Sequence, residues 1–125
     1  MSVERTRLQF RIADRLQDER AEGEALLQLL VTTPDGDVRT DVAWASPERR
    51  SKLKTTDGPL APEICVEVVP SEAEGAAPDL RETFFDAGAQ EVWICDPSGA
   101  VRFFGPEGER ETSDFVPGFP SHVAS

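Results

Sequence analysis

Apolar residues near the start of the chain recur with the period of an α-helix. Leu8, Ile12 and Leu16 are spaced four apart with Ala13 beside them, while charged residues fill most of the other positions. This spacing predicts an amphipathic helix over residues 3–21, whose apolar stripe faces a core.

Short apolar runs, rich in β-branched residues, indicate strands. The turn residues Asp35 and Gly36 separate the first two runs, which we expect to form a hairpin. A later run begins after Pro62 and ends at Pro70, and two more flank a turn at 96–99. The predicted strands are 25–33, 38–45, 63–69, 91–95 and 100–104.

A second helix is predicted over residues 78–87, with Gly88 as its stop and Leu80, Phe84 and Ala87 as its core face. We expect an acidic, flexible connection at 71–78. Two further segments lack a clear period. Residues 46–60 are predicted to be a loop with at most one helical turn, and the tail is predicted to be turn-rich and anchored by Phe115 and Phe119.

The order of predicted elements is helix, three strands, helix, two strands. Strands 63–69 and 91–95 are joined across a helix, so they should be parallel neighbours with a right-handed crossover. The hairpin before them is antiparallel. The sequence therefore predicts an α/β protein with a mixed β-sheet flanked by helices, as one domain over residues 1–125.

The charge is distributed unevenly. The net charge is −11, yet the first 54 residues hold ten basic and ten acidic groups. The whole net negative charge therefore lies in residues 55–125. A protein that coats phosphates would be basic overall, so any nucleic-acid contact is expected from the N-terminal half. The alternative is a solvated surface. The candidate contacts are Arg7, Arg11, Arg15, Arg49, Arg50 and Lys52.

Cysteine content and hydropathy limit the possible environment. Cys65 and Cys95 both lie in apolar runs without metal-ligand spacing, so we expect two buried free thiols. No apolar run approaches the length of a membrane span, and the charged N-terminus does not resemble a signal peptide. These features favour a cytoplasmic protein that does not enter the membrane.

Two carboxylates stand out because burying an unpaired charge is expensive. Asp41 begins the apolar stretch of one strand, and Glu67 lies inside another. If these strands are neighbours, the two groups can converge and, with the backbone carbonyl of Val68, form an oxygen site suited to Mg²⁺ or Mn²⁺. Such a site would support metal-assisted phosphodiester hydrolysis. Alternatively, Glu67 pairs with an arginine or lies on a solvated sheet face.

Four blocks in order resemble one family over most of the chain. They are TDVAWAS (40–46), APEICVEVV (61–69), FFDAGA (84–89) and EVWICDP (91–97), and they resemble the Uma-two family of putative restriction endonucleases, within the PD-(D/E)XK nuclease-like superfamily. The resemblance implies a restriction-endonuclease-like core, Asp41 and Glu67 as catalytic metal ligands, Mg²⁺ or Mn²⁺ as cofactor, and DNA as substrate.

The resemblance fails at the catalytic lysine. The family position is Leu80 here, position 69 is Val69, and no lysine follows Lys54. Arg81 is the nearest basic candidate, although a guanidinium that does not deprotonate substitutes poorly for an ammonium. We therefore consider two main hypotheses, a weak endonuclease and a catalytically inactive binding or assembly module. A small-molecule or regulatory domain is a third.

A homodimer is expected, and the inactive module in particular could assemble in this way, although the sequence leaves the oligomeric state open. Phe103, Phe104 and Phe115 are the candidate apolar contacts, and they could equally belong to the core.

Overall fold

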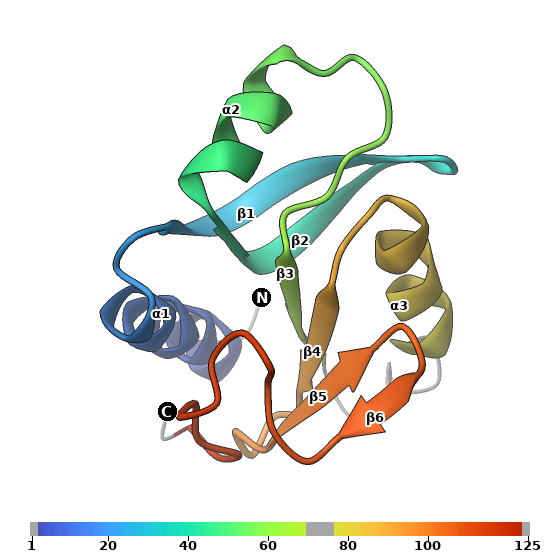
Figure 1. Ribbon diagram of the computed structural model, residues 1–125. Helices are drawn as coiled ribbons and strands as arrows, with labels where there is room; N and C mark the ends of the chain where they lie inside the picture. Colours follow the sequence, from blue (N-terminus) through green and yellow to red (C-terminus); the bar gives the residue numbers. More distant parts are fainter. Residues whose placement is uncertain (1–2, 70–76, 124–125) are drawn as a thin grey trace.

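A computed structural model describes residues 3–69 and 77–123. Within these residues the chain forms a mixed six-stranded sheet in the order β1-β2-β3-β4-β5-β6, with three helices (Figure 1). Only β3 and β4 are parallel; every other neighbouring pair is antiparallel. The elements are α1 (Val3–Glu19), β1 (Glu24–Thr33), β2 (Gly36–Ala45), α2 (Pro47–Thr55), β3 (Ile64–Val68), α3 (Ala77–Asp86), β4 (Glu91–Cys95), β5 (Val101–Gly105) and β6 (Gly108–Arg110).

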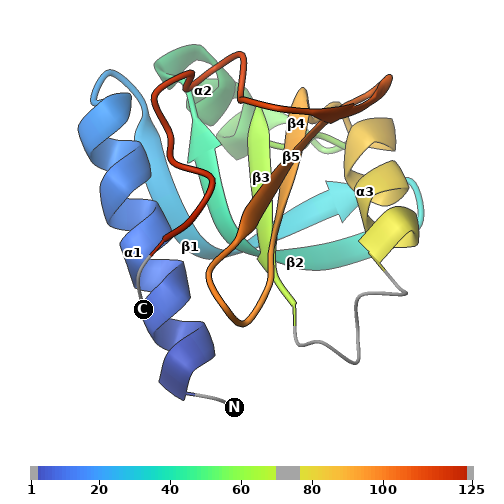
Figure 2. The ribbon, with the colours of Figure 1, turned by 90° about the horizontal axis from the view of Figure 1, so that it is seen from below.

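Helices α1 and α3 cover opposite faces of the sheet (Figure 2). On the α1 face, Leu8, Ile12 and Leu16 are fully buried against residues that include Val66 and Trp93. The stripe predicted for the first helix is therefore confirmed, and so is the parallel pairing across α3.

The α3 face has its own core. Phe84 is fully buried against Cys65, Val92 and Ile94, and the partly buried Leu80 packs on the same cluster. The cysteines Cys65 and Cys95 are both buried free thiols, as predicted. None of the helices in the described part of the chain is both long enough and apolar enough to cross a bilayer.

The β1–β2 hairpin bends at the middle of its length. The last aligned pair between β2 and β3 is Val42 with Val66, and beyond it the hairpin runs toward α3 (Figure 2), where Val31 joins the α3-face core. Within the hairpin, the pairing of β1 with β2 skips Gln28, whose φ of +54° is rare for a residue other than glycine. The bend therefore opens the sheet where β2 leaves β3.

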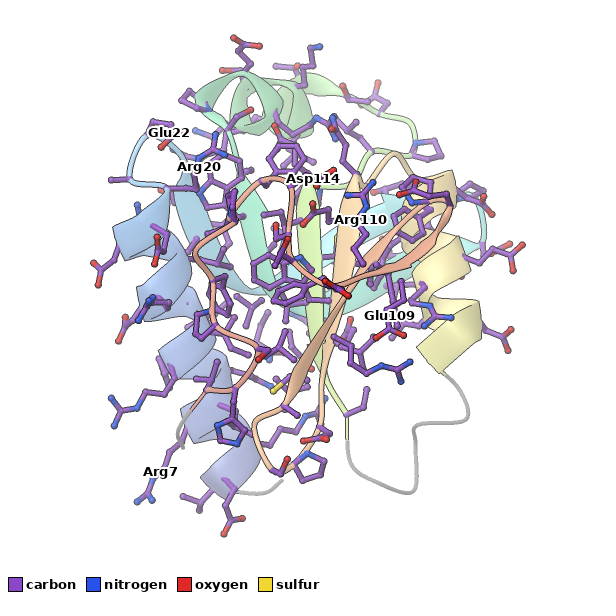
Figure 3. All side chains as sticks on the ribbon, turned by 60° about the horizontal axis from the view of Figure 1, so that its bottom comes forward. Arg7, Arg20, Glu22, Glu109, Arg110 and Asp114 are labelled. Atoms are coloured by element: carbon purple, nitrogen blue, oxygen red, sulfur yellow. The ribbon has the colours of Figure 1, made fainter. Side chains whose placement is uncertain are left out.

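The C-terminal segment is fastened to the sheet by Glu91, which is 1% exposed. Its carboxylate accepts hydrogen bonds from Trp93 Nε1 (2.9 Å), Ser113 Oγ (2.5 Å) and the backbone N–H of Asp114 (2.7 Å). Arg110 pairs with Glu91 at 3.2 Å and with Asp114 at 3.0 Å (Figure 3). The tail is thus held by hydrogen bonds and an ion pair centred on a buried carboxylate.

Two sequence predictions about secondary structure were wrong, and a third concerns residues that the structure does not describe. Residues 46–60 are not a loop, because Ser46 caps a nine-residue helix by accepting a hydrogen bond from the N–H of Arg49, with Pro47 in the first turn. The tail also contains the short strand β6, which was not predicted. Most of the flexible connection expected at 71–78 falls on residues 70–76, outside the described residues.

The apolar residues expected at a dimer interface are mainly core. Phe103 and Phe104 are 2% and 3% exposed, and Phe103 packs edge-on against Trp93 with their ring centroids 5.0 Å apart. Of the three candidates only Phe115 is partly exposed. The core alternative therefore holds for Phe103 and Phe104, and the homodimer stays a prediction.

Candidate active site

The structure brings Asp41 and Glu67 together at the opening between β2 and β3. Val42 pairs with Val66, so the same antiparallel register continued by one residue places Asp41 opposite Glu67. Both residues are buried, at 5% and 4% exposure. The two carboxyl groups thus lie side by side with little access to water.

Asp41 is held from two directions. The backbone N–H of Val68 donates to Oδ2 at 2.9 Å. This contact lies just beyond the last aligned pair of β2 with β3, so a side chain of β2 rather than its backbone accepts the hydrogen bond there. Nη2 of Arg5, in the first turn of α1, lies 3.2 Å from Oδ1 and 3.1 Å from Oδ2. The carboxylate therefore has a buried amide on one side and a guanidinium on the other.

Glu67 has a different environment from its neighbour. Its Oε1 is buried, and among the described residues no donor reaches it. Burial raises the pKa of Glu67 well above its usual range, and the charge of Asp41 and a side-chain hydrogen bond with Asp41 raise it further, whereas the charge of Arg5 lowers it. When Glu67 is protonated it can donate to Asp41, and when it is ionised Oε1 has no partner. A perturbed, poorly satisfied acid is typical of functional sites.

The arginine that reaches the acidic pair is Arg5, which contacts Asp41 and whose charge also lowers the pKa of Glu67. Arg5 was not predicted from the sequence. Its spacing was the only sequence signal, because residues three and four apart share one face of a helix. Arg5 lies three residues before Leu8 and four before Gln9, which are both buried on α1.

Two glutamines connect α1 to the bend. Gln28 Nε2 on β1 donates to Oε1 of Gln9 on α1 at 2.9 Å, and Gln28 itself has the positive φ described above. In the hairpin register this strained residue stands opposite Asp41. Strained backbone conformations of this kind concentrate at functional sites. Neither glutamine was predicted from the sequence.

The acidic pair fits a hard divalent cation better than a soft one. Among the residues in 3–69 and 77–123 no group of three His, Cys, Asp or Glu side chains could hold a metal ion. Mg²⁺ needs only one or two carboxylates and keeps several waters, so the donor set it requires could be supplied by Asp41 and Glu67, whose Oε1 lacks a donor among the described residues. The carbonyl of Val68 follows Glu67 directly, and it is the predicted third ligand.

Cys65 does not extend this ligand set, although it shares the face of Glu67. Burial raises the pKa of the Cys65 thiol well above its usual range, and the charge of Glu67 raises it further. Only the thiolate is a good metal ligand. A thiolate-based site next to the carboxylates is therefore disfavoured.

Arg81 is not brought to the acidic pair. Its guanidinium lies 3.8 Å from the ring centroid of Phe104 on β5, beside Arg102, which lies 5.2 Å from the same centroid. The charges that act on Glu67 come from Asp41 and Arg5. The catalytic position predicted for Arg81 is therefore not the one that the side chain takes.

The predicted nucleic-acid contacts divide into engaged and outward-facing residues. Arg49 Nη1 donates to the carbonyls of Ala61 (2.5 Å) and Gly88 (3.3 Å), so its side chain ties α2 to two loops. Arg7 points outward from α1 (Figure 3) and is exposed, as are Arg11 and Lys52. Arg15 pairs with Glu19 at 2.9 Å and Arg50 with Glu24 at 3.3 Å. Their contact with nucleic acid remains a prediction.

The architecture is that of an α/β protein with a mixed sheet, and this fold occurs in a solved structure. One solved structure with this fold is a putative nuclease belonging to DUF820 from Anabaena variabilis ATCC 29413, with a TM-score of 0.72 at 16% sequence identity. The similarity covers 87% of this chain and 66% of that chain, so this chain spans somewhat less than two thirds of its neighbour's length. At this identity the likeness shows the fold.

The family follows from the sequence match. The Uma2 family, described as "Putative restriction endonuclease", matches residues 2–120, and the chain belongs to this family. The resemblance carried by the four sequence blocks is thereby confirmed. No curated protein matches the chain.

Proposed function

We propose that this chain is a metal-dependent endonuclease that hydrolyses phosphodiester bonds in DNA, with Asp41 and Glu67 holding Mg²⁺ or Mn²⁺. The observation that carries the proposal is the buried carboxyl group of Glu67, which lies beside Asp41 and whose Oε1 lacks a donor among the described residues. Membership in the family supports a nuclease.

Each residue of the site has a distinct role in this proposal. Asp41 is fixed by the N–H of Val68, so its carboxylate is preorganised. Glu67 must release its proton to become a ligand. A divalent cation bound there would polarise the phosphoryl group and lower the pKa of a water molecule. Arg81 is left out of the catalytic group because it stacks on Phe104.

In this proposal the rate of phosphodiester hydrolysis is low. The position of the family lysine is Leu80, which packs on the α3-face core, and the nearest cation, Arg5, cannot act as a general base. The loss of a positioned acid–base group typically costs about 10²–10⁴-fold in rate.

A second candidate is a catalytically inactive nuclease-fold protein that serves as a binding or dimeric assembly module. The contact of Arg5 with both oxygens of Asp41 favours this candidate, because a guanidinium already supplies the positive charge that the pair needs. In that case the acidic pair and Arg5 have only a structural role.

Cleavage of supercoiled plasmid DNA in Mg²⁺ or Mn²⁺ separates the two candidates. We expect slow nicking that disappears in EDTA and in Glu67→Gln. Glu109→Gln is the matched control, since Glu109 is an exposed carboxylate paired with Arg102 at 2.7 Å, and we expect it to nick like the wild type. Equal background activity in all three proteins would favour the inactive module.

A further inference from the structure

We infer that Arg5 sets how tightly the Asp41–Glu67 pair holds a divalent cation, because its guanidinium occupies the carboxylate that the cation must bind. This inference rests on the proposed function, since it requires the pair to be a cation site. It assigns Arg5 as a positioning residue and gives it no chemical step.

The contacts of Asp41 show the competition directly. Arg5 Nη2 lies 3.2 Å from Oδ1 and 3.1 Å from Oδ2, and Oδ2 also accepts the N–H of Val68. A cation that binds between the two residues therefore finds Oε1 of Glu67 without a hydrogen-bond donor among the described residues. The charge of the Asp41 carboxylate, by contrast, is already neutralised by Arg5. Binding to both groups requires Arg5 to give up at least part of its contact.

Arg5 is placed so that it can leave. Its side chain is 41% exposed, whereas that of Asp41 is 8% exposed, so the guanidinium approaches the buried carboxylate from the solvent side. Water can therefore solvate the guanidinium as soon as a cation replaces it at Asp41. Arg5 also sits in the first turn of α1, so its displacement needs no movement of the sheet.

The competition has a consequence for cation selection. A guanidinium carries one charge, so a divalent cation gains more from two adjacent carboxylates than Arg5 gains from one of them. A monovalent cation has no such advantage over a tethered arginine. The site should therefore respond to Mn²⁺ and Mg²⁺ while remaining closed to Na⁺ and K⁺.

Titration of the protein with Mn²⁺, followed by calorimetry and by the loss of the free-ion electron paramagnetic resonance signal, tests this role. We expect Arg5→Gln to bind Mn²⁺ about tenfold more tightly than the wild type, within the range of ordinary coupling effects. Arg7→Gln is the matched control, because Arg7 is exposed on the same helix and its removal changes the net charge equally. We expect its affinity to equal that of the wild type.

Two further variants keep the result interpretable. Arg5→Lys retains the charge and loses the planar fork of the guanidinium, so its Mn²⁺ affinity should fall between those of the wild type and Arg5→Gln. It also provides the test if Arg5→Gln fails to fold, which thermal unfolding monitored by circular dichroism would show. Glu67→Gln should abolish the Mn²⁺ site in either background.

The outcomes separate this inference from the proposed function. If wild type and Arg5→Gln bind Mn²⁺ equally tightly and both lose it in Glu67→Gln, the role of Arg5 is refuted and the cation site stands. Equal tightening in Arg5→Gln and Arg7→Gln would also refute it, since only overall charge would then matter. If neither wild type nor Arg5→Gln binds Mn²⁺, the cation site and the role of Arg5 both fail.

Discussion

Two carboxylates buried to a similar depth on adjacent parallel strands have opposite surroundings. Glu91, at the start of β4, is 1% exposed and accepts hydrogen bonds from an indole, a hydroxyl and backbone amides. Glu67, on β3, is 4% exposed and has an oxygen that no donor among the described residues reaches. The carboxylate of Glu91 thus accepts hydrogen bonds at both oxygens, whereas that of Glu67 has one oxygen without a donor among the described residues.

The contrast distinguishes an acid whose hydrogen bonds hold the fold together from the acid that we propose to bind a cation. Burying a carboxylate costs free energy that only hydrogen bonds and paired charges offset. Around Glu91 they do so, and the network fastens the C-terminal segment to the sheet. Around Glu67 they leave Oε1 without a partner among the described residues, as the proposed cation site requires.

The largest expected effect is at Glu91. Replacement by alanine leaves Ser113 Oγ, Trp93 Nε1 and the amide of Asp114 without their acceptor, and Arg110 without one of its partners. We expect Glu91→Ala to lower the free energy of unfolding by about 3–5 kcal/mol, as is typical when a buried ion pair loses one member. Urea unfolding followed by tryptophan fluorescence measures this change. A loss below about 1 kcal/mol would contradict a structural role.

At Glu67 the expected effect has the opposite sign. Glutamine has nearly the same shape, carries no charge and can donate to Asp41, so Glu67→Gln should raise the free energy of unfolding of the metal-free protein by about 1–3 kcal/mol at pH 8. Urea unfolding in EDTA measures this gain. If Glu67→Gln is instead as destabilising as Glu91→Ala, the two acids are both structural.

The same substitution should alter the response to pH. Because the folded state raises the pKa of Glu67 above its ordinary 4.5, the folded protein binds more protons than the unfolded chain between that pH and the raised pKa. The contribution of Glu67 to stability is therefore fully present below pH 4.5 and is lost as pH rises through the raised pKa. The stability advantage of Glu67→Gln should be smallest near pH 4 and grow toward pH 8, as unfolding across that range can show. A constant difference would contradict this assignment.

The smallest expected effect concerns the bend beside Asp41. Gln28 has a φ of +54°, which asparagine tolerates and β-branched residues do not. Gln28→Val should therefore cost about 1 kcal/mol more than Gln28→Asn in unfolding experiments. If the two variants are equally stable, the bend stores no strain.

Much of the fold could be predicted because apolar periodicity marks it. Helix α1, the hairpin and the parallel pair β3–β4 all bury a regular stripe or run. Helix α2 could not be predicted in this way, because none of its residues is buried and its stability depends on the Ser46 cap and on charges at its ends. Strand β6 is three residues long and has no buried position.

The candidate site was predictable only in part. Asp41 and Glu67 could be selected because each is a charge within an apolar strand. The partner of Arg5 could not be predicted, since the contact joins residues 36 positions apart and the spacing from Leu8 and Gln9 shows only that Arg5 lies near the inner stripe of the helix. The positive φ of Gln28 follows from the tertiary bend and leaves no sign in the residue type.

The central claim is that Asp41 and Glu67 together hold one divalent cation. Anomalous diffraction from a crystal soaked in Mn²⁺ tests it most directly. We predict a single peak between the two carboxylates, within roughly 2.0–2.3 Å of an oxygen from each, with Arg5 moved off Asp41. An absence of density there, with the guanidinium of Arg5 still on Asp41, would contradict the claim.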